Sequence, residues 1–426
     1  MTNPVGRDPR RAPAVASEKK KYREQGSIDY VFFALVVILL FIGTVMVFSA
    51  SYTYARQNQN GDSYFFARKQ IFFAILGIVI MLIASRVDTN IIRKFTVPIF
   101  IVSLVLMLFV VVAPESIAPS IKGAKRWINL PMLGSFQPSE VYKFAIILLF
   151  ADYIPKKRDR IISDNNIESF IYGVLPYIAV ALVSAVVMYL QPHMSGLIII
   201  ALIMMMMMFI GETKWRYFGA AAVLGVVLLG LLALTLSHAV TRLEVWRDPF
   251  SYMSDASGGK GWQPAQALYA ISAGGIFGVG LGNSNQKQLY LPEPQNDYIF
   301  PIFCEEFGFI GAVAVILLYV LLIYRGVTIA MKAVDRFSRL LALGIVFQVA
   351  IQTILNICVV TNLLPSTGIS LPFFSYGGSS VLVLLGEMGI VLGISRYSLV
   401  EKKQPSTVHR IRRIRAANEG QNTDRK

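Results

Sequence analysis

The sequence contains few charged residues and almost no cysteine or histidine. Of its 426 residues, 15% are Asp, Glu, Lys or Arg, and there are two cysteines and three histidines. So few charges cannot cover the surface of a water-soluble protein of this length, which argues against a soluble fold. Cys304 and Cys358 each lie in an apolar stretch, so we expect small buried side chains and not a disulfide framework. His193, His238 and His409 have no partners at metal-ligand spacing, so the sequence predicts no metal site.

Long apolar runs take the place of the missing polar residues. Hydrophobic residues make up 55% of the chain, and the mean hydropathy is +0.58. A helix that crosses a bilayer needs about 20 mostly apolar residues. The sequence therefore predicts an all-α fold, a polytopic integral membrane protein with about ten transmembrane helices. The predicted helices are 28–50, 70–86, 95–113, 138–154, 170–190, 194–210, 216–236, 298–324, 338–361 and 379–399.

The basic residues between these runs predict the orientation. With the N-terminus in the cytoplasm, the cytoplasmic segments hold 29 Lys and Arg residues and the external segments hold 10. This bias places both basic tails, 1–27 and 401–426, in the cytoplasm, with the predicted helices in the region 28–400 between them. The long segment 237–297, between the seventh and eighth helices, is then external, and we expect it to carry function or structure of its own. The net charge of +15 suits anionic inner-leaflet lipids, so nucleic-acid binding is not needed to explain it.

Ionisable residues at membrane depth are costly and point to function. Glu140 and Lys143 lie three residues apart at the start of the fourth run, on one helical face. Arg126 and Trp127 lie just upstream. One interpretation is a structural Glu140–Lys143 ion pair with Trp127 as an interfacial anchor. The other is an external anion site of Arg126 and Lys143, suited to a lipid pyrophosphate.

Asp297 lies where the external segment 237–297 meets the eighth run. A carboxylate at that position either caps the helix or serves a function, and position alone favours the cap. The glycine-rich stretch 274–282 has no preceding strand and no βαβ unit, so a nucleotide-binding loop is a poor interpretation. Tight turns or close backbone packing against a membrane helix explain these glycines better.

The segment 364–380 is uncharged, rich in proline and glycine, and too apolar for an ordinary loop. This combination predicts a re-entrant or cavity-lining segment, because irregular backbone at membrane depth must be satisfied by protein or water. The Ser375 hydroxyl, Tyr376, and the backbone amides of Gly377 and Gly378 are candidates to bind sugar or phosphate. Simple helix capping is the alternative.

These segments, in this order, resemble the SEDS family (shape, elongation, division and sporulation), which includes FtsW, RodA and SpoVE. The resemblance covers roughly residues 28–400. The most specific match is 371–379, which reads Leu-Pro-Phe-Phe-Ser-Tyr-Gly-Gly-Ser. The other matches are 123–128, 137–140 with Lys143, 283–293, and 297–300 with Glu305 and Glu306.

The resemblance implies a peptidoglycan glycosyltransferase of the bacterial cytoplasmic membrane. Such an enzyme polymerises lipid II on the outer membrane face during division, sporulation or elongation, by inverting transfer that releases undecaprenyl pyrophosphate. The resemblance makes Asp297 the catalytic carboxylate, places Arg126, Glu140 and Lys143 in the substrate cavity, and makes Trp127 important for activity. A class B penicillin-binding transpeptidase is the implied partner. A divalent cation, Mg²⁺ or Mn²⁺, is a candidate cofactor that would stabilise the leaving pyrophosphate.

One position departs from the family pattern. The family usually has Asp and a Gly-Thr pair where this chain has His193, Met194, Ser195 and Gly196. Any role of that Asp is therefore not carried over to this chain. Residues 48–51 and 137–140 favour the division and sporulation branch over RodA. A lipid-linked precursor flippase or other transporter is the alternative function, although a transporter site is expected near the midplane and these candidates cluster on the external side. A purely scaffolding protein is a third possibility.

Overall fold

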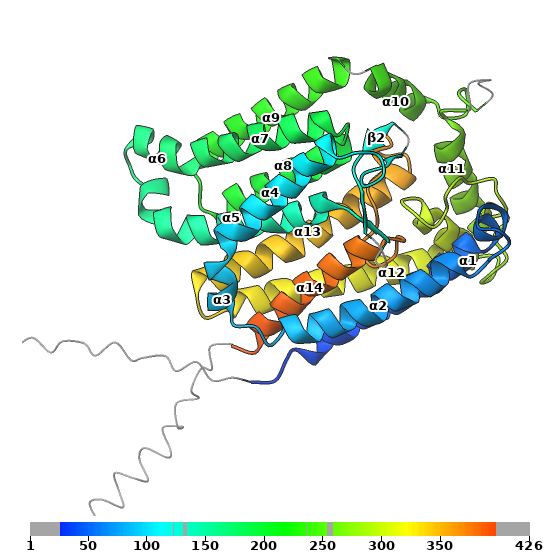
Figure 1. The fold of residues 1–426 in the computed structure, drawn as a ribbon, viewed down its shortest axis with the longest axis horizontal. Helices are drawn as coiled ribbons and strands as arrows, with labels where there is room; N and C mark the ends of the chain where they lie inside the picture. The colour runs from blue at the N-terminus through cyan, green and yellow to red at the C-terminus, as the bar shows by residue number, and fades with distance from the viewer. Residues whose placement is uncertain (1–25, 122, 131–133, 236, 254–258, 398–426) are drawn as a thin grey trace, which may run out of the picture. The chain divides into compact units, whose positions relative to one another are not determined.

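The computed structural model describes residues 26–397 except 122, 131–133, 236 and 254–258. The predictions for the two tails and for His409 lie outside this part of the chain, as does the side chain of His238. The described part is a bundle of helices (Figure 1). The helices are α1 Tyr30–Asn58, α2 Phe65–Ala84, α3 Thr89–Lys94, α4 Thr96–Val112, α5 Pro138–Ile161, α6 Asn166–Gly173, α7 Leu175–Leu190, α8 Met194–Ile210, α9 Trp215–Thr235, α10 Ser237–Arg247, α11 Trp262–Gly274, α12 Ile299–Met331, α13 Arg336–Val360 and α14 Gly378–Ser395.

Each of the ten predicted runs is a helix in the structure, as α1, α2, α4, α5, α7, α8, α9, α12, α13 and α14. Within the described residues, six helical spans are long and apolar enough to cross a membrane, and α4 and α8 are shorter apolar helices. The predicted fold class, a helical polytopic membrane protein, is confirmed. The count of about ten crossings stays a prediction.

Ion pairs gather the segments predicted to be cytoplasmic at one end of the bundle. These pairs join α1 to α12, α3 to α5, and α5 to the α8–α9 turn: Asp29 with Arg325 at 2.8 Å, Arg93 with Asp152 at 2.6 Å, and Arg158 with Glu212 at 2.5 Å. The Arg93 guanidinium also lies 5.2 Å from the centroid of the Phe337 ring at the start of α13. Figure 1 shows α3 and α6 at the left end of the bundle and β2, α10 and α11 at the right. We call the end with β2, α10 and α11 the Asp297 end, since Asp297 lies in the segment that leads from α11 to α12.

The segments at the Asp297 end carry more structure than loops. Residues 114–137 contain two antiparallel strand pairs, β1 (Ser120–Ile121) with β2 (Ala124–Lys125) and β3 (Ile128–Leu130) with β4 (Gly134–Phe136). The all-α prediction did not include these short strands. The segment 237–297 contains α10 and α11, which agrees with the expectation that it has structure of its own.

A break in α12 explains the glycine-rich stretch. Gly308 has a φ of 67°, so the helix is interrupted there, and neighbouring backbone groups pair outside the helix. The amides of Val279 and Gly280 donate to the carbonyls of Glu305 and Glu306 at 2.9 and 3.0 Å. In return, Phe309 donates to Gly275 at 2.9 Å. A Cβ atom at Gly274 would lie 2.0 Å from the Cys304 carbonyl oxygen, which confirms close backbone packing against a membrane helix.

Candidate functional site

Two adjacent buried acids on α12 hold the chain that leads to Asp297. The Glu305 carboxylate accepts from the backbone amides of Asn285 at 2.9 Å and Gln286 at 3.3 Å. The Glu306 carboxylate pairs with Lys287 Nζ at 2.7 Å and accepts from the Ser49 hydroxyl of α1 at 2.7 Å. The side chains of Lys287 and Glu306 are 5% and 0% exposed. The segment 283–297 is therefore anchored on α12 and α1. These anchors help to fix the position of Asp297 at its end.

Asp297 does not act as the cap of α12. The N-cap residue is Tyr298, and it makes no side-chain cap hydrogen bond, so the cap interpretation was wrong. The Asn356 side-chain amide of α13 donates to the backbone carbonyls of both Asp297 and Ile369, each at 2.7 Å. A Cβ atom at Gly368 would lie 3.4 Å from Asp297 Oδ2. The half-buried carboxylate thus lies beside the irregular segment between α13 and α14.

The basic candidates lie at the same end. Lys143 Nζ and Glu140 form an ion pair of 2.9 Å on the first turns of α5, and the Lys143 side chain is 4% exposed. The predicted pairing is therefore correct. The Arg126 guanidinium donates to the carbonyls of Gln191, at 3.3 Å, and Pro192. Burial, and then the charge of Arg242 on α10, lower the Arg126 pKa.

His193 lies in the turn between α7 and α8, next to these cations. It is 9% exposed, and its Nδ1 has no hydrogen-bond partner among the described residues. A Cβ atom at Gly196 would lie 2.8 Å from this Nδ1, so only glycine leaves room for the ring. Burial, followed by the charges of Arg126 and Lys143, lowers the His193 pKa to about 3, so the imidazole is neutral at physiological pH.

The same turn connects the cations to the segment beside Asp297. The Ser195 hydroxyl donates to the carbonyl of Thr367, which precedes Gly368. Arg126 binds the turn at Gln191 and Pro192, and Ser195 binds the segment next to Asp297. The α7–α8 turn is therefore hydrogen-bonded both to Arg126 and to the segment beside Asp297.

The remaining predicted residues differ in their surroundings. The Ser375 hydroxyl accepts from the Leu371 amide at 2.8 Å. Tyr376 packs edge-on against Phe66 of α2 with 5.0 Å between ring centroids. The Gly377 amide donates to Gln70 of α2 at 3.5 Å, and a Cβ atom at Gly378 would lie 2.5 Å from the Phe73 ring. Trp127 is half-buried between β2 and β3. Substrate contact by these residues stays a prediction.

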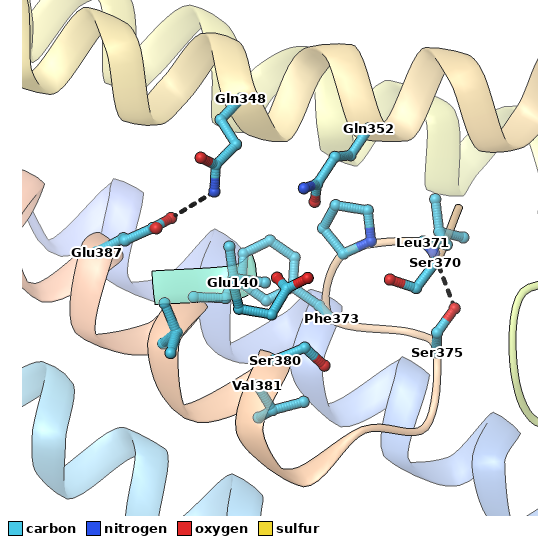
Figure 2. A pocket seen from close by; sticks show the side chains of 13 residues that line it. Glu140, Gln348, Gln352, Ser370, Leu371, Phe373, Ser375, Ser380, Val381 and Glu387 are labelled. Atoms are coloured by element: carbon cyan, nitrogen blue, oxygen red, sulfur yellow. Dashed lines mark hydrogen bonds between the residues drawn. The ribbon is translucent and has the colours of Figure 1, made fainter. Parts of the chain in front are cut away.

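A polar cavity lies between α5, α13, α14 and the irregular segment that joins α13 to α14 (Figure 2). Its walls carry two carboxylates, two carboxamides and three hydroxyls, from Glu140, Glu387, Gln348, Gln352, Ser370, Ser375 and Ser380. The prediction that 364–380 lines a cavity is therefore confirmed for residues 370–373, 375 and 380. The Gln348 amide donates to Glu387 at 2.9 Å, as the dashed line in Figure 2 shows.

Sequence reasoning missed Glu387, Gln348 and Gln352. Glu387 is 2% exposed on α14, in a stretch that is otherwise apolar from Val381 to Ile394. A carboxylate in the middle of an apolar run was the available signal, because such residues at membrane depth are rare and point to function. The two glutamines, four residues apart on α13, would not have been found from sequence, since an uncharged amide in an apolar run costs less.

Residues 29–399 match the cell cycle protein family of FtsW, RodA and SpoVE. The chain belongs to this family. A probable peptidoglycan glycosyltransferase FtsW of Trichlorobacter lovleyi is 38% identical over 86% of this chain and 93% of that protein. Stage V sporulation protein E of Bacillus subtilis is 36% identical over 87% of this chain and 98% of that protein. The predicted resemblance to FtsW, RodA and SpoVE is confirmed.

Two solved structures share the FtsW/RodA/SpoVE-type fold. A chain of a peptidoglycan synthase complex that coordinates polymerization and crosslinking aligns with a TM-score of 0.68 at 23% identity, covering 87% of this chain and 98% of that chain. RodA of Thermus thermophilus aligns with a TM-score of 0.62 at 24% identity, covering 87% and 97%. At these identities the likeness supports the fold of the membrane bundle.

Proposed function

We propose that this chain is a peptidoglycan glycosyltransferase that polymerises lipid II on the outer face of the bacterial cytoplasmic membrane. The relative with 38% identity is named a probable peptidoglycan glycosyltransferase, and it aligns over 86% of this chain. The observation that carries the proposal is the convergence of Asp297, Arg126 and Lys143 at one end of the bundle. The α7–α8 turn bonds to Arg126 and to the segment beside Asp297, and the Lys143 charge acts on His193 of the same turn. The positive-inside bias of 29 basic residues to 10 supports an external location for this end.

Asp297 would act as the general base. Its carboxylate removes the proton from the acceptor GlcNAc 4-hydroxyl, and the oxygen attacks the anomeric carbon of the donor MurNAc. A new glycosidic bond forms with inversion, and the bond to undecaprenyl pyrophosphate breaks. Negative charge grows on the departing pyrophosphate, where Arg126 and Lys143 would stabilise it. Glu140, paired at 2.9 Å, holds the Lys143 ammonium charged and oriented.

The proposed partner is a class B penicillin-binding transpeptidase, supported by the likeness to a chain of a peptidoglycan synthase complex. The metal requirement is a separate question. Within the described residues, no three His, Cys, Asp or Glu side chains come together as a metal site. We therefore assign no step to a protein-held metal, and the effect of chelation on polymerisation tests the need for Mg²⁺ or Mn²⁺.

The test is polymerisation of purified lipid II by Asp297→Asn. Loss of a positioned base costs about 10²- to 10⁴-fold in rate, so glycan products should fall by at least about 100-fold while thermal stability stays close to that of the unmutated protein. Asp248→Asn is the matched control, because Asp248 is an exposed acid of the same segment, bonded to Ser251.

Two results would defeat the proposal. One is full activity of a folded Asp297→Asn protein. The other is leaflet transfer of lipid II in liposomes without any new glycosidic bond, which would identify a transporter.

A further inference from the structure

Helix α10 is held against the end of α13 by a reciprocal pair of hydrogen bonds. The Trp246 indole donates to the Asn362 carbonyl at 3.0 Å, and the Asn362 side chain donates to the Trp246 carbonyl at 3.1 Å. Asn362 lies just after α13, at the beginning of the irregular segment that passes Asp297. Arg242 is four residues before Trp246, so both side chains project from the same face of α10. The two hydrogen bonds therefore hold the part of α10 that carries Arg242, an exposed residue, beside the start of the irregular segment.

The charge of Arg242 acts on residues in both parts of that site. Its charge acts on Arg126, whose pKa is lowered first by burial and then by Arg242. It also acts on Tyr298, the neighbour of Asp297. Burial and the Asp297 charge raise the Tyr298 pKa, and the hydrogen bond with Ser366, followed by the Arg242 charge, opposes that rise. The guanidinium thus lies within electrostatic reach of Arg126 and of the Asp297 region.

Among the described residues, no salt bridge neutralises either guanidinium group. In the part of the chain that the structure describes, neither Arg126 nor Arg242 forms an ion pair with an acid. Two like charges, one of them half-buried, repel each other, and an anion bound between them converts that repulsion into attraction. A planar guanidinium can donate two parallel hydrogen bonds to phosphate oxygens, so two of them suit a ligand with several phosphate oxygens.

We infer that Arg242 is a second guanidinium of the pyrophosphate site, and that Arg126 and Arg242 bind the pyrophosphate of the lipid-linked donor between them. This inference rests on the proposed function and adds a residue that neither the motifs nor the spacing of the sequence singled out. Arg126 approaches from the strand pairs and Arg242 from α10. Lys143, which already pairs with Glu140, contributes charge from α5.

The test compares Arg242→Ala with Arg247→Ala. Arg247 is exposed on the same helix, five residues further on, and serves as the matched control for charge and helix propensity. Loss of a charge-assisted hydrogen bond to phosphate should lower kcat/KM for lipid II polymerisation by about 10- to 100-fold in Arg242→Ala. Arg247→Ala should stay within about twofold. Arg242→Lys should fall between Arg242→Ala and the unmutated protein, because it keeps the charge and loses the planar fork.

Inorganic pyrophosphate provides a readout that does not depend on catalysis. A ligand that binds only the folded protein raises its melting temperature, so pyrophosphate should stabilise the unmutated protein and Arg247→Ala but have a clearly smaller effect on Arg242→Ala. If Arg242→Ala does not fold, Arg242→Gln replaces it in both assays. Equal polymerisation and equal pyrophosphate response in a folded Arg242 variant and the Arg247 control overturn the inference. Failure of the unmutated protein to polymerise lipid II, with the pyrophosphate response intact, would instead count against the proposed function.

Discussion

Replacing Lys287 with methionine should strongly destabilise the protein. The Lys287 ammonium is 2.7 Å from Glu306 and 2.9 Å from the Ser49 hydroxyl, and both charged side chains are at most 5% exposed. Lys287→Met leaves the Glu306 carboxylate buried with only the Ser49 hydroxyl as a donor. Breaking a buried ion pair from one side typically costs about 3–5 kcal/mol, because an uncompensated charge stays in a medium of low polarity.

The double variant Lys287→Met/Glu306→Leu separates the value of the pair from the penalty of an unpaired charge. Replacing both charges with apolar groups of similar size is often neutral. We therefore expect the double variant to be more stable than either single variant, with strong non-additivity in the free energy of unfolding. The assay is thermal and denaturant unfolding in one detergent, with Lys260→Met as an exposed lysine control from the same segment.

The same variants should also lower polymerisation activity, because they change how Asp297 is held in place. Lys287 anchors the segment that ends at Asp297, so polymerisation by Lys287→Met should fall even at temperatures where the protein remains folded. Additive losses in the double variant, or a loss below about 1 kcal/mol in Lys287→Met, a value typical of an exposed pair, would refute the reasoning that burial dominates here.

Two further predictions concern packing and pH. Gly43→Ala should destabilise the bundle, since its Cβ would lie 2.2 Å from the Phe373 carbonyl oxygen. Gly386→Ala, whose Cβ would meet only Ile80 at 3.6 Å, should be neutral or stabilising; equal melting temperatures would contradict this. The His193 pKa is lowered from 6.5 to about 3 on folding. The unfolded chain therefore binds the proton first, and stability falls as pH drops below 6.5. His193→Gln should lose part of that slope in melting curves between pH 7 and 4.5, and parallel slopes would disprove it.

Local patterns were enough to predict the helices and one contact within a single turn. Glu140 pairs with Lys143 three residues later in α5, because this contact depends only on helical geometry. The close packing of the 274–282 glycines was also predicted, since a glycine-rich stretch without a βαβ unit leaves few alternatives. The cap assignment of Asp297 was wrong because α12 begins one residue later than predicted, at Ile299 with Tyr298 as the N-cap, and composition cannot show a shift of one residue.

The sequence by itself determined that the chain is a helical membrane protein, and its basic residues predict the orientation. Each apolar run meets the lipid requirement independently of the others, so composition over about 20 residues is sufficient. Only the tertiary structure decided which polar groups meet. Ser195 with Thr367, Asn356 with Asp297, and Trp246 with Asn362 are separated by 59 to 172 residues along the chain. Such pairs depend on how helices pack, and no local pattern encodes that packing.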